Sequence, residues 1–272
     1  MNSLRFPEPS LLHALTLLAV QASRAVLTAR QTKPTPHTKP DGSPVTSADV
    51  AAESVILEGL ARLLPGLPVV SEENGASSPA PGHTFLLVDP LDGTREFISG
   101  RDEFTVNIAL IVEGQPELGL VAAPALGTVW RGTRGAGAER LRFDADGLGK
   151  AEPVRTRPMP ARAPIAFASR SHLDADTAAM LDAIPGAVRH ACGSALKFCR
   201  LAEGAGDLYP RLAPTSEWDV AAGHALLAAG GGTVLTPNGG TLLYGNAEGR
   251  FILPAFIAWG DPAAVHASLA GA

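Results

Sequence analysis

The sequence has few cysteines, few aromatic residues and no long apolar run, and each shortage excludes a class of protein. Its two cysteines, Cys192 and Cys199, are too few for a disulfide framework, and their spacing suggests packing on one helix face rather than a zinc site. Aromatic residues make up 5% of the chain, which argues against a surface that stacks single-stranded nucleic acid. No run of about 18 apolar residues occurs, so a membrane-spanning helix is not expected.

Positive charge is also scarce. The chain has 22 Lys and Arg against 27 Asp and Glu, a net charge of −5, and no basic stripe of the kind that binds a nucleic-acid polymer. A small anionic substrate could still bind if metal ions lay between it and the acidic groups. We therefore expect a small-molecule partner and no polymeric nucleic acid.

Apolar residues and turn formers are abundant instead. Of the 272 residues, 46% are hydrophobic, and 29 Gly and 23 Pro provide many turns. This length predicts one large domain or two modest lobes. Apolar residues between Leu11 and Val26 recur at helical spacing, which indicates an amphipathic first helix rather than a secretory signal peptide. We expect a cytoplasmic protein, and peripheral contact with the inner face of the cytoplasmic membrane stays open.

Helical and strand-like segments are mixed along the chain. Further helices are predicted over 46–64, 174–184, 194–203 and 218–229, with a short one from 261; strands are predicted over 69–70, 85–88, 104–112, 118–123 and 164–168, with a hairpin near 130–137. The Pro-rich segment 31–44 reads as an irregular loop. A Pro- and Arg-rich seam over 151–164 divides the chain into lobes 1–155 and 156–272, which we expect to work as one unit. The mixture predicts a layered α/β or α+β protein.

The segment Leu86 to Phe97, with the sequence LLVDPLDGTREF, carries the strongest chemical signal. An apolar strand ends at Asp89, and Asp92 follows three residues later, before a short helix. Carboxylates bind hard cations, and the N–H groups of a helix start favour a phosphate oxygen. The corner therefore indicates a metal-assisted phosphate site. The alternative is that Asp89 and Asp92 only cap the helix.

Other acids join this corner in the same pattern. Glu72 and Glu73 follow the preceding strand, and Asp219 opens the helix that begins near Trp218. Acids at strand ends and helix starts, without His or Cys among them, suit Mg²⁺ rather than zinc. If they converge, their mutual repulsion makes the site costly without bound cations.

These motifs resemble the lithium-sensitive, Mg²⁺-dependent phosphatase superfamily of inositol monophosphatase and fructose-1,6-bisphosphatase. The order of DPLDGT (89–94) and WDVAAG (218–223) carries the resemblance, which extends over nearly the whole chain. Four further motifs make the chain most similar to the CysQ-type 3'(2'),5'-bisphosphate nucleotidases: TREF (94–97), EFTVNIAL (103–110), SRSH (169–172) and GSALKFC (193–199). The resemblance implies an α+β fold, a layered αβαβα sandwich of the sugar-phosphatase type, as a monomer or homodimer.

The resemblance also implies a metal site and a catalytic pair. Two or three Mg²⁺ ions are expected. Their ligands would be Glu72, Asp89, the carbonyl of Leu91, Asp92 and Asp219. Glu73 would lie next to these ligands without binding the metal. Thr94 and Asp49 would orient the attacking water, and Gly93 and Thr94 would offer N–H groups to the scissile phosphate. Asp49 also stands at the fourth position of a helix capping box, which is a purely structural explanation for it.

A second phosphate of the substrate is assigned by the resemblance to Ser194, Lys197 and Arg211. Spacing places Ser194 and Lys197 on one face at the start of a helix, and Arg211 after a turn at 209–210. The implied substrate is adenosine 3',5'-bisphosphate, from which AMP and phosphate are the products. Its sulfated relative is a second candidate substrate. Arg170, Ser171 and His172 are candidates for the nucleoside pocket.

Two alternatives stay open. One is an inositol- or sugar-phosphate phosphatase on the same scaffold, for which Glu217 could hold a polyol hydroxyl. The other is a catalytically silent nucleotide or metal sensor, which the presence of every expected ligand and of Thr94 argues against.

Overall fold

Two β-sheets form the framework of the computed structural model, which describes residues 9–40, 42–73 and 80–269. The larger sheet has the strand order β3 (Val69–Ser71), β4 (Thr84–Asp92), β5 (Thr105–Val112), β6 (Gln115–Ala123), β7 (Thr128–Thr133), β8 (Gly137–Arg142) and β9 (Glu152–Val154). Its strands pair in antiparallel fashion, except β3 with β4. The smaller sheet has the order β11 (Val188–Cys192), β10 (Ile165–Ser169), β12 (Leu208–Arg211), β16 (Phe256–Trp259) and β14 (Thr233–Leu235).

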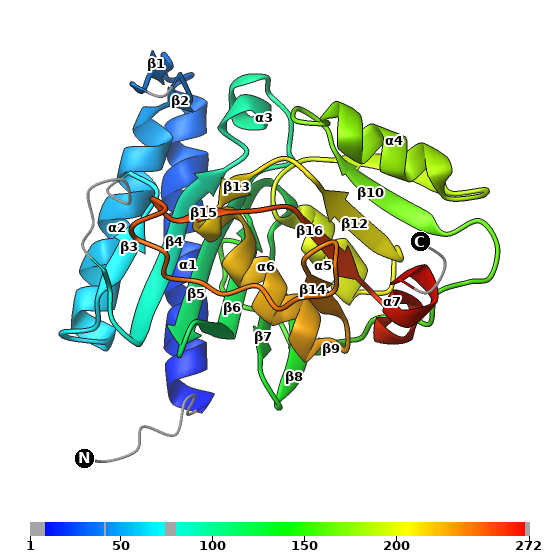
Figure 1. The fold of residues 1–272 in the computed structure, drawn as a ribbon. Coiled ribbons are helices and arrows are strands. Elements are labelled where there is room, and N and C mark those ends of the chain that lie inside the picture. The colour runs from blue at the N-terminus through cyan, green and yellow to red at the C-terminus, as the bar shows by residue number, and fades with distance from the viewer. Residues whose placement is uncertain (1–8, 41, 74–79, 270–272) are drawn as a thin grey trace.

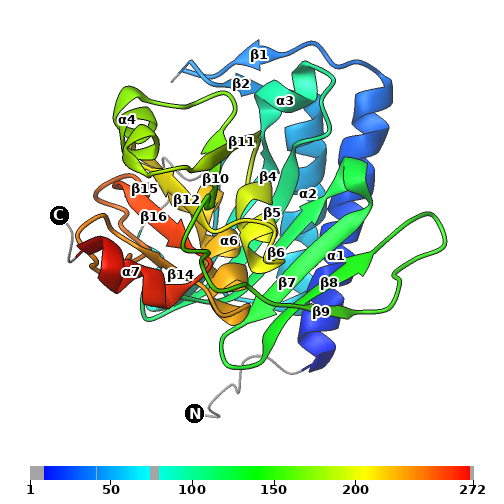
Figure 2. The same cartoon turned by 90° about the vertical axis from the view of Figure 1, so that its right-hand side faces the viewer.

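Helices separate and cover the two sheets, as Figures 1 and 2 show. Helices α1 (Pro9–Gln31) and α2 (Ser47–Leu63) cover the outer face of the larger sheet. Helices α5 (Leu196–Ala202) and α6 (Glu217–Ala229) lie between the sheets, and α4 (Ala175–Ala183) and α7 (Pro262–Leu269) cover the far face of the smaller one. This arrangement confirms the expected layered αβαβα sandwich of the α+β class.

The central strands of the larger sheet are buried on both faces, because helices cover both. All of β5 except its last residue is buried, which explains its nearly continuous apolar sequence. Residues of β4 to β6 that face α1 and α2 form one core cluster, and alternate residues of the same strands pack against α5 and α6 in another.

Several short elements complete the fold. They are β1 (His37–Thr38), β2 (Pro44–Val45), α3 (Thr94–Ile98), the 3-10 turn η2 (Pro124–Leu126), β13 (Thr215–Ser216) and β15 (Ile252–Leu253). The pair β1 and β2 lies inside the segment that the sequence predicts to be an irregular loop, so that prediction is wrong in part. The larger sheet ends at Val154 and the smaller begins at Ile165. The division into lobes 1–155 and 156–272 stays a prediction.

Two predictions around α5 are wrong. The helix begins at Leu196, because Ser194 has a left-handed φ of 49°, so Ser194 precedes the helix instead of opening it. The two free cysteines do not share a helix face, since Cys192 ends β11 and Cys199 lies in α5. Both cysteines are buried, and burial raises the pKa of both thiols.

Helix α1 is long and apolar enough to cross a membrane, by length and composition. Eight of its residues are nevertheless buried, and the six apolar ones, among them Leu15, Ala19 and Val26, pack in the cluster that α2 and the larger sheet share. The helix therefore serves as a core helix of the fold, as its helical spacing predicts.

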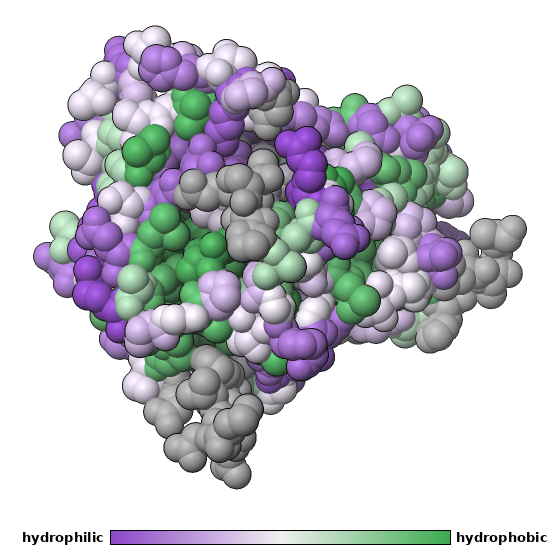
Figure 3. Space-filling view, turned by 60° about the vertical axis from the view of Figure 1, so that its left-hand side comes forward, coloured by the Kyte–Doolittle hydropathy of each residue, from purple (hydrophilic) through white to green (hydrophobic). Residues whose placement is uncertain are grey.

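Apolar side chains also reach the surface. Val50 in α2, Leu243 and Ile252 are 58%, 62% and 44% exposed. Figure 3 shows apolar residues gathered on the side of the molecule that carries α2, with hydrophilic residues around them. A local apolar area of this kind is common on water-exposed surfaces.

The contact between α6 and the larger sheet depends on glycine. A Cβ on Gly119 of β6 would lie 2.1 Å from the carbonyl oxygen of Ala222, and one on Gly132 of β7 would lie 2.8 Å from Cα of Leu226. Larger residues would push α6, and Asp219 in its first turn, away from the sheet.

We expect Gly119→Ala to lower the free energy of unfolding by about 3 kcal/mol, because the added methyl meets helix backbone that cannot yield locally. Chemical denaturation followed by circular dichroism measures this. Ala136→Ser, in the exposed turn between β7 and β8, is the control and should change stability by less than about 0.5 kcal/mol. Equal stabilities for the two variants would contradict the close packing of α6.

Candidate active site

The Asp89–Thr94 corner is built at the end of β4. The pairing of β4 with β5 becomes irregular between Asp89 and Asp92, and α3 begins at Thr94. Gly93 precedes the helix with φ +91°, and a Cβ there would lie 2.9 Å from the Glu103 carbonyl oxygen, so glycine is required. No side chain caps α3. The alternative in which Asp89 and Asp92 serve only as helix caps is therefore wrong.

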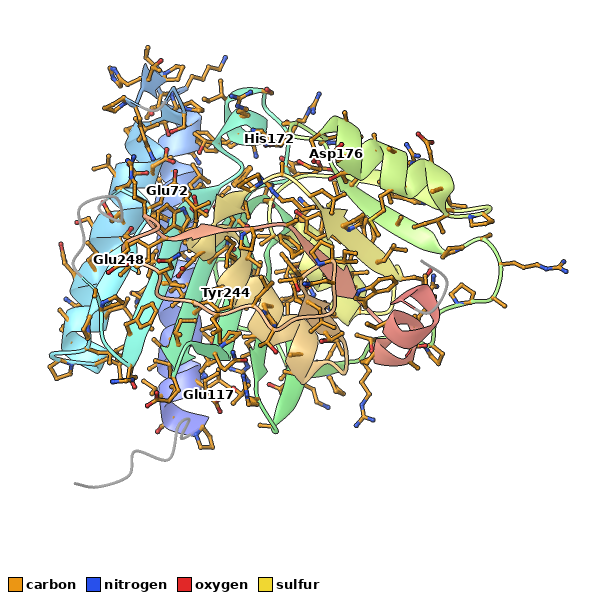
Figure 4. All side chains as sticks on the ribbon, in the orientation of Figure 1. Glu72, Glu117, His172, Asp176, Tyr244 and Glu248 are labelled. Atoms are coloured by element: carbon orange, nitrogen blue, oxygen red, sulfur yellow. The ribbon has the colours of Figure 1, made fainter. Side chains whose placement is uncertain are left out.

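Most predicted site residues line one cavity of about 510 Å³ between the two sheets. Its lining includes Glu72, Asp89, Leu91, Asp92, Gly93, Thr94, His172, Ser194, Lys197, Arg211 and Asp219. The remaining two, Asp49 and Glu73, lie just behind it and bond to Thr94 and Lys39. Figure 4 labels Glu72 and His172 on opposite sides of this region. Residues far apart in the sequence thus meet as predicted.

The acids of the cavity oppose one another's ionisation. Burial, reinforced by the charges of Glu72, Asp92 and Asp219, raises the pKa of Asp89 well above its ordinary value. Burial and then the charge of Asp219 raise the pKa of Asp92 to about 7. Burial raises the pKa of Glu72 to about 7 even though Lys39 acts in the opposite direction. A divalent cation would remove this repulsion.

Protein groups engage several of these carboxylates. Lys39 donates to Glu72 at 2.8 Å and to Glu73 at 2.7 Å, and its own pKa is raised above the usual lysine value. The N–H of Ala195 donates to Asp92 at 2.6 Å, and the hydroxyl of Thr215 donates to Asp219. In their present positions, the Asp, Glu, His and Cys side chains of the described residues form no group of three that could hold a metal ion. Lys39 occupies Oε1 of Glu72, so Oε2 is the oxygen of this carboxylate that Lys39 leaves for an ion.

The chemistry of the surrounding atoms fits a hard cation. The donor atoms are oxygens, which Mg²⁺ prefers. Three buried polar atoms without a hydrogen-bond partner border the acids: Ser71 Oγ beside Glu72, Thr105 Oγ1 opposite Asp92, and Asn107 Oδ1 opposite Asp89. Unsatisfied buried polar atoms are rare in folded proteins and often mark a site for an ion or water.

Asp49 combines the structural and the chemical explanation. Its Oδ2 accepts from the N–H of Thr46 at 2.8 Å and from the Thr46 hydroxyl at 2.7 Å, which completes the capping box of α2. Its Oδ1 lies 3.2 Å from the Thr94 hydroxyl, which also lies 3.1 Å from the Leu91 carbonyl oxygen. Burial raises the pKa of Asp49, which brings this carboxylate nearer to the range of a proton acceptor at neutral pH.

Lys197 and Arg211, from the C-terminal half of the chain, form a cationic side of the cavity. The Lys197 ammonium donates to the carbonyls of Ser194 at 2.6 Å and Cys192 at 3.2 Å and lies 4.9 Å from the centre of the Tyr209 ring. Arg211 is the last residue of β12, which also contains positions 209 and 210. The turn predicted at 209–210 is therefore wrong. The Nε of Arg211 is buried without a hydrogen-bond partner, and one Nη reaches the Pro214 carbonyl at only 3.5 Å. This guanidinium can therefore donate hydrogen bonds to an anionic group.

The structure separates the three candidates for the nucleoside pocket. His172 lines the cavity, and burial lowers its pKa. Arg170 points instead into a neighbouring cleft, where it pairs with Glu103. Ser171 donates a hydrogen bond to Glu96, a buried residue of the cavity lining.

Sequence reasoning did not identify Lys39, Asn107 or Arg250 as parts of this region. Lys39 and Arg250 line the cavity, and Asn107 lies 3.4 Å from Asp92. The position of Asn107 within the strand that follows the corner was a usable signal, since antiparallel pairing brings it beside Asp89. Lys39 and Arg250 lie in loops without such a pattern.

Comparison with known proteins places this geometry in a family. The model of the inositol monophosphatase family matches residues 9–269. The chain belongs to the inositol monophosphatase family. The 3'(2'),5'-bisphosphate nucleotidase CysQ of Salmonella typhimurium is 46% identical over 220 residues, which cover 80% of this chain and 86% of that protein. The CysQ of Aggregatibacter actinomycetemcomitans is 33% identical over 257 residues, 91% of each chain.

Solved structures of the inositol monophosphatase family agree with this placement. The crystal structure of CysQ from Bacteroides thetaiotaomicron has a TM-score of 0.79 and 32% identity, and the match covers 94% of this chain and 98% of that one. An inositol monophosphatase from Anabaena has a TM-score of 0.75 at 23% identity, covering 96% of each chain, which supports the fold alone. Phosphatases of this family are generally metal-dependent, in accord with the acidic cavity.

We expect Mg²⁺ to raise Tm by about 5 °C more at pH 8 than at pH 6. The pKa of Glu72 and of Asp92 rises from an ordinary value near 4 to about 7 in the metal-free fold. An acid with a raised pKa stabilises the fold while it holds its proton, so the metal-free protein loses stability as pH rises through about 4 to 7. At pH 6 protons compete with the metal, whereas at pH 8 the metal relieves the full repulsion.

Thermal unfolding with and without Mg²⁺ at the two pH values measures this difference. Asp89→Asn is the control, since it removes a carboxylate from the centre of the acids and should largely abolish the Mg²⁺ effect. An equal rise at both pH values would contradict the coupling between protonation and metal binding.

Proposed function

We propose that the chain is a Mg²⁺-dependent 3'(2'),5'-bisphosphate nucleotidase. It hydrolyses the 3'(2')-phosphate of adenosine 3',5'-bisphosphate and releases AMP and phosphate. The observation that carries this proposal is the division of one cavity into an acidic corner and a cationic wall, formed by Lys197 and Arg211. A phosphate that is cleaved and a phosphate that is only held need these two environments.

The relatives support the same assignment. CysQ proteins that carry the name 3'(2'),5'-bisphosphate nucleotidase match 76–92% of this chain at 31–46% identity, as the relatives from Salmonella typhimurium and Haemophilus influenzae illustrate. The motif residues that resemblance assigns to the second phosphate, Ser194, Lys197 and Arg211, all line the cavity.

The reaction is attack of water on phosphorus, in line with the departing sugar oxygen. The new bond joins the water oxygen to phosphorus, and the bond from phosphorus to the sugar oxygen breaks. The sugar oxygen takes a proton from solvent and becomes a hydroxyl of AMP. Thr94 orients the water through its hydroxyl, and Asp49 accepts the proton at Oδ1, the oxygen that the capping box leaves free. The N–H groups of Gly93 and Thr94, at the start of α3, face the scissile phosphate.

The metal would be held by the oxygens of Glu72, Asp89, Leu91, Asp92 and Asp219, and two or three Mg²⁺ ions are proposed. When bound, Mg²⁺ lowers the pKa of a coordinated water and stabilises negative charge on phosphate and leaving-group oxygens. Lys39 lies against the same acids and keeps positive charge beside them.

The second candidate, a polyol phosphatase, loses its main support. Glu217 is fully buried, and its oxygens accept the N–H groups of Gly245 at 2.6 Å and Asn246 at 2.9 Å. It does not line the cavity among the described residues, so it cannot bind a polyol hydroxyl there. The cavity wall offers cations in its place.

Asp89→Asn should lower kcat by at least about 10³-fold in saturating Mg²⁺, because the change removes the charge of the central acid. Phosphate release from adenosine 3',5'-bisphosphate measures the effect, and circular dichroism checks the fold. Substantial retained turnover would refute the metal assignment.

Lys197→Ala should reduce kcat/KM for adenosine 3',5'-bisphosphate by about 100-fold and that for adenosine 3'-monophosphate by less than about threefold. The monophosphate lacks the second phosphate and therefore does not need the lysine. The rate of phosphate release from inositol 1-phosphate tests the polyol alternative in the same assay. Lithium should inhibit the wild type, as the family resemblance implies. Equal losses on the two nucleotides would refute the role of Lys197.

A further inference from the structure

Four motifs meet at one joint between the two sheets. Glu96 comes from TREF, Glu103 from EFTVNIAL, Arg170 and Ser171 from SRSH, and Gly193 from GSALKFC. The proposed function explains Thr94, Ser194 and Lys197 in these motifs but leaves the five joint residues without a task. We define the joint by these five residues.

Glu103 is the centre of the joint. Its carboxylate accepts two hydrogen bonds from the Arg170 guanidinium, at 2.6 and 2.7 Å, and a third from the N–H of Gly193 at 3.0 Å. Arg170 also donates to the carbonyl of Ala191 at 2.7 Å. The Arg170 guanidinium holds the pKa of Glu103 below its usual value, so the pair stays charged at neutral pH. A bidentate Arg–carboxylate contact fixes both geometry and distance.

The segment 100–104 that carries Glu103 is itself held in place by α1. Arg30 donates to the carbonyls of Gly100 at 2.9 Å and Arg101 at 3.0 Å, and it lies 5.1 Å from the centre of the Phe104 ring. Glu103 therefore projects from a supported loop of the first lobe.

Gly193 is glycine because the joint is tight. A Cβ there would lie 2.8 Å from the Glu103 carbonyl oxygen and 3.0 Å from Cγ of Glu96. Glu96 is 4% exposed and accepts the hydroxyl of Ser171, which ties the 169–172 loop to the same place. The joint thus brings the backbone of the second lobe directly onto two acids of the first.

The joint controls the turn that carries Ser194. The N–H of Gly193 bonds to Glu103, the N–H of Ala195 bonds to Asp92 at 2.6 Å, and Ser194 between them has a φ of 49°. A left-handed φ is costly for a serine and persists only where the surroundings fix it. Lys197 then closes the turn by bonding to the Ser194 carbonyl at 2.6 Å.

We propose that Glu103, acting through Arg170 and Gly193, is a positioning residue that sets the separation between the Asp89–Thr94 corner and the turn 193–197. The corner is the proposed place of the scissile phosphate and the turn that of the second phosphate, so this inference rests on the proposed function. Neither Glu103 nor Arg170 lines the substrate cavity among the described residues. Both line the adjoining cleft, so they act on the substrate only through the turn.

Glu103→Gln tests this role, because it removes the charge while keeping the size. We expect KM for adenosine 3',5'-bisphosphate to rise about tenfold, with kcat within about twofold of the wild type, and both parameters for adenosine 3'-monophosphate to stay within about twofold. Arg170→Lys keeps the charge but not the bidentate contact, and we expect an intermediate rise in KM. Arg170→Lys also carries the test if Glu103→Gln fails to fold.

Glu139→Gln is the matched control. Glu139 accepts two hydrogen bonds from Arg131, at 3.0 and 2.8 Å, within the β7–β8 pair and away from the cavity. It should leave both KM values unchanged. A rise in KM that is equal for the two nucleotides, a fall in kcat alone, or no difference between Glu103→Gln and Glu139→Gln would overturn the positioning role. Failure of the wild type to hydrolyse the bisphosphate would instead overturn the proposed function.

Discussion

The mutual repulsion of buried carboxylates at the end of β4 is the constraint on which the rest of the site depends. Asp89 is 1% exposed, and the charges of Glu72, Asp92 and Asp219 all act to keep it protonated. A fold does not gather such groups for stability, since burying like charges is costly. In this chain Lys39 and the N–H of Ala195 offset part of the repulsion. What remains is a site of oxygen donors that suits a divalent cation.

The packing of the layers brings further residues to that corner. Helix α6 lies against the larger sheet closely enough to need glycine on β6 and β7, and its first turn brings Asp219 to the acids. The same helix belongs by sequence to the second half of the chain, which also supplies Lys197 and Arg211. The cavity therefore joins the acidic corner of the first half to the groups that the second half supplies, and the joint around Glu103 holds the two halves together.

Asp49 shows how structural and chemical demands share one side chain. One carboxylate oxygen closes the capping box of α2, and the other faces Thr94. The helix cap immobilises the carboxylate, and an immobile base is more effective at a fixed water position. The structural and the catalytic explanations of this residue are thus compatible.

The sequence by itself determined a layered fold of mixed helices and strands and the acidic corner, because strand ends, helix starts and the DPLDGT and WDVAAG motifs are local signals. Its resemblance to the family added the αβαβα class and most of the candidate site residues, of which eleven line the cavity. It did not determine that Ser194 lies outside α5, that β12 includes Arg211, or that Arg170 points away from the substrate cavity. Nor did it show the contacts of Lys39 with Glu72 or of Glu103 with Gly193. The last two contacts join groups that are 33 and 90 residues apart in the sequence. Only tertiary packing brings such groups within hydrogen-bond distance, and no local pattern records the partner.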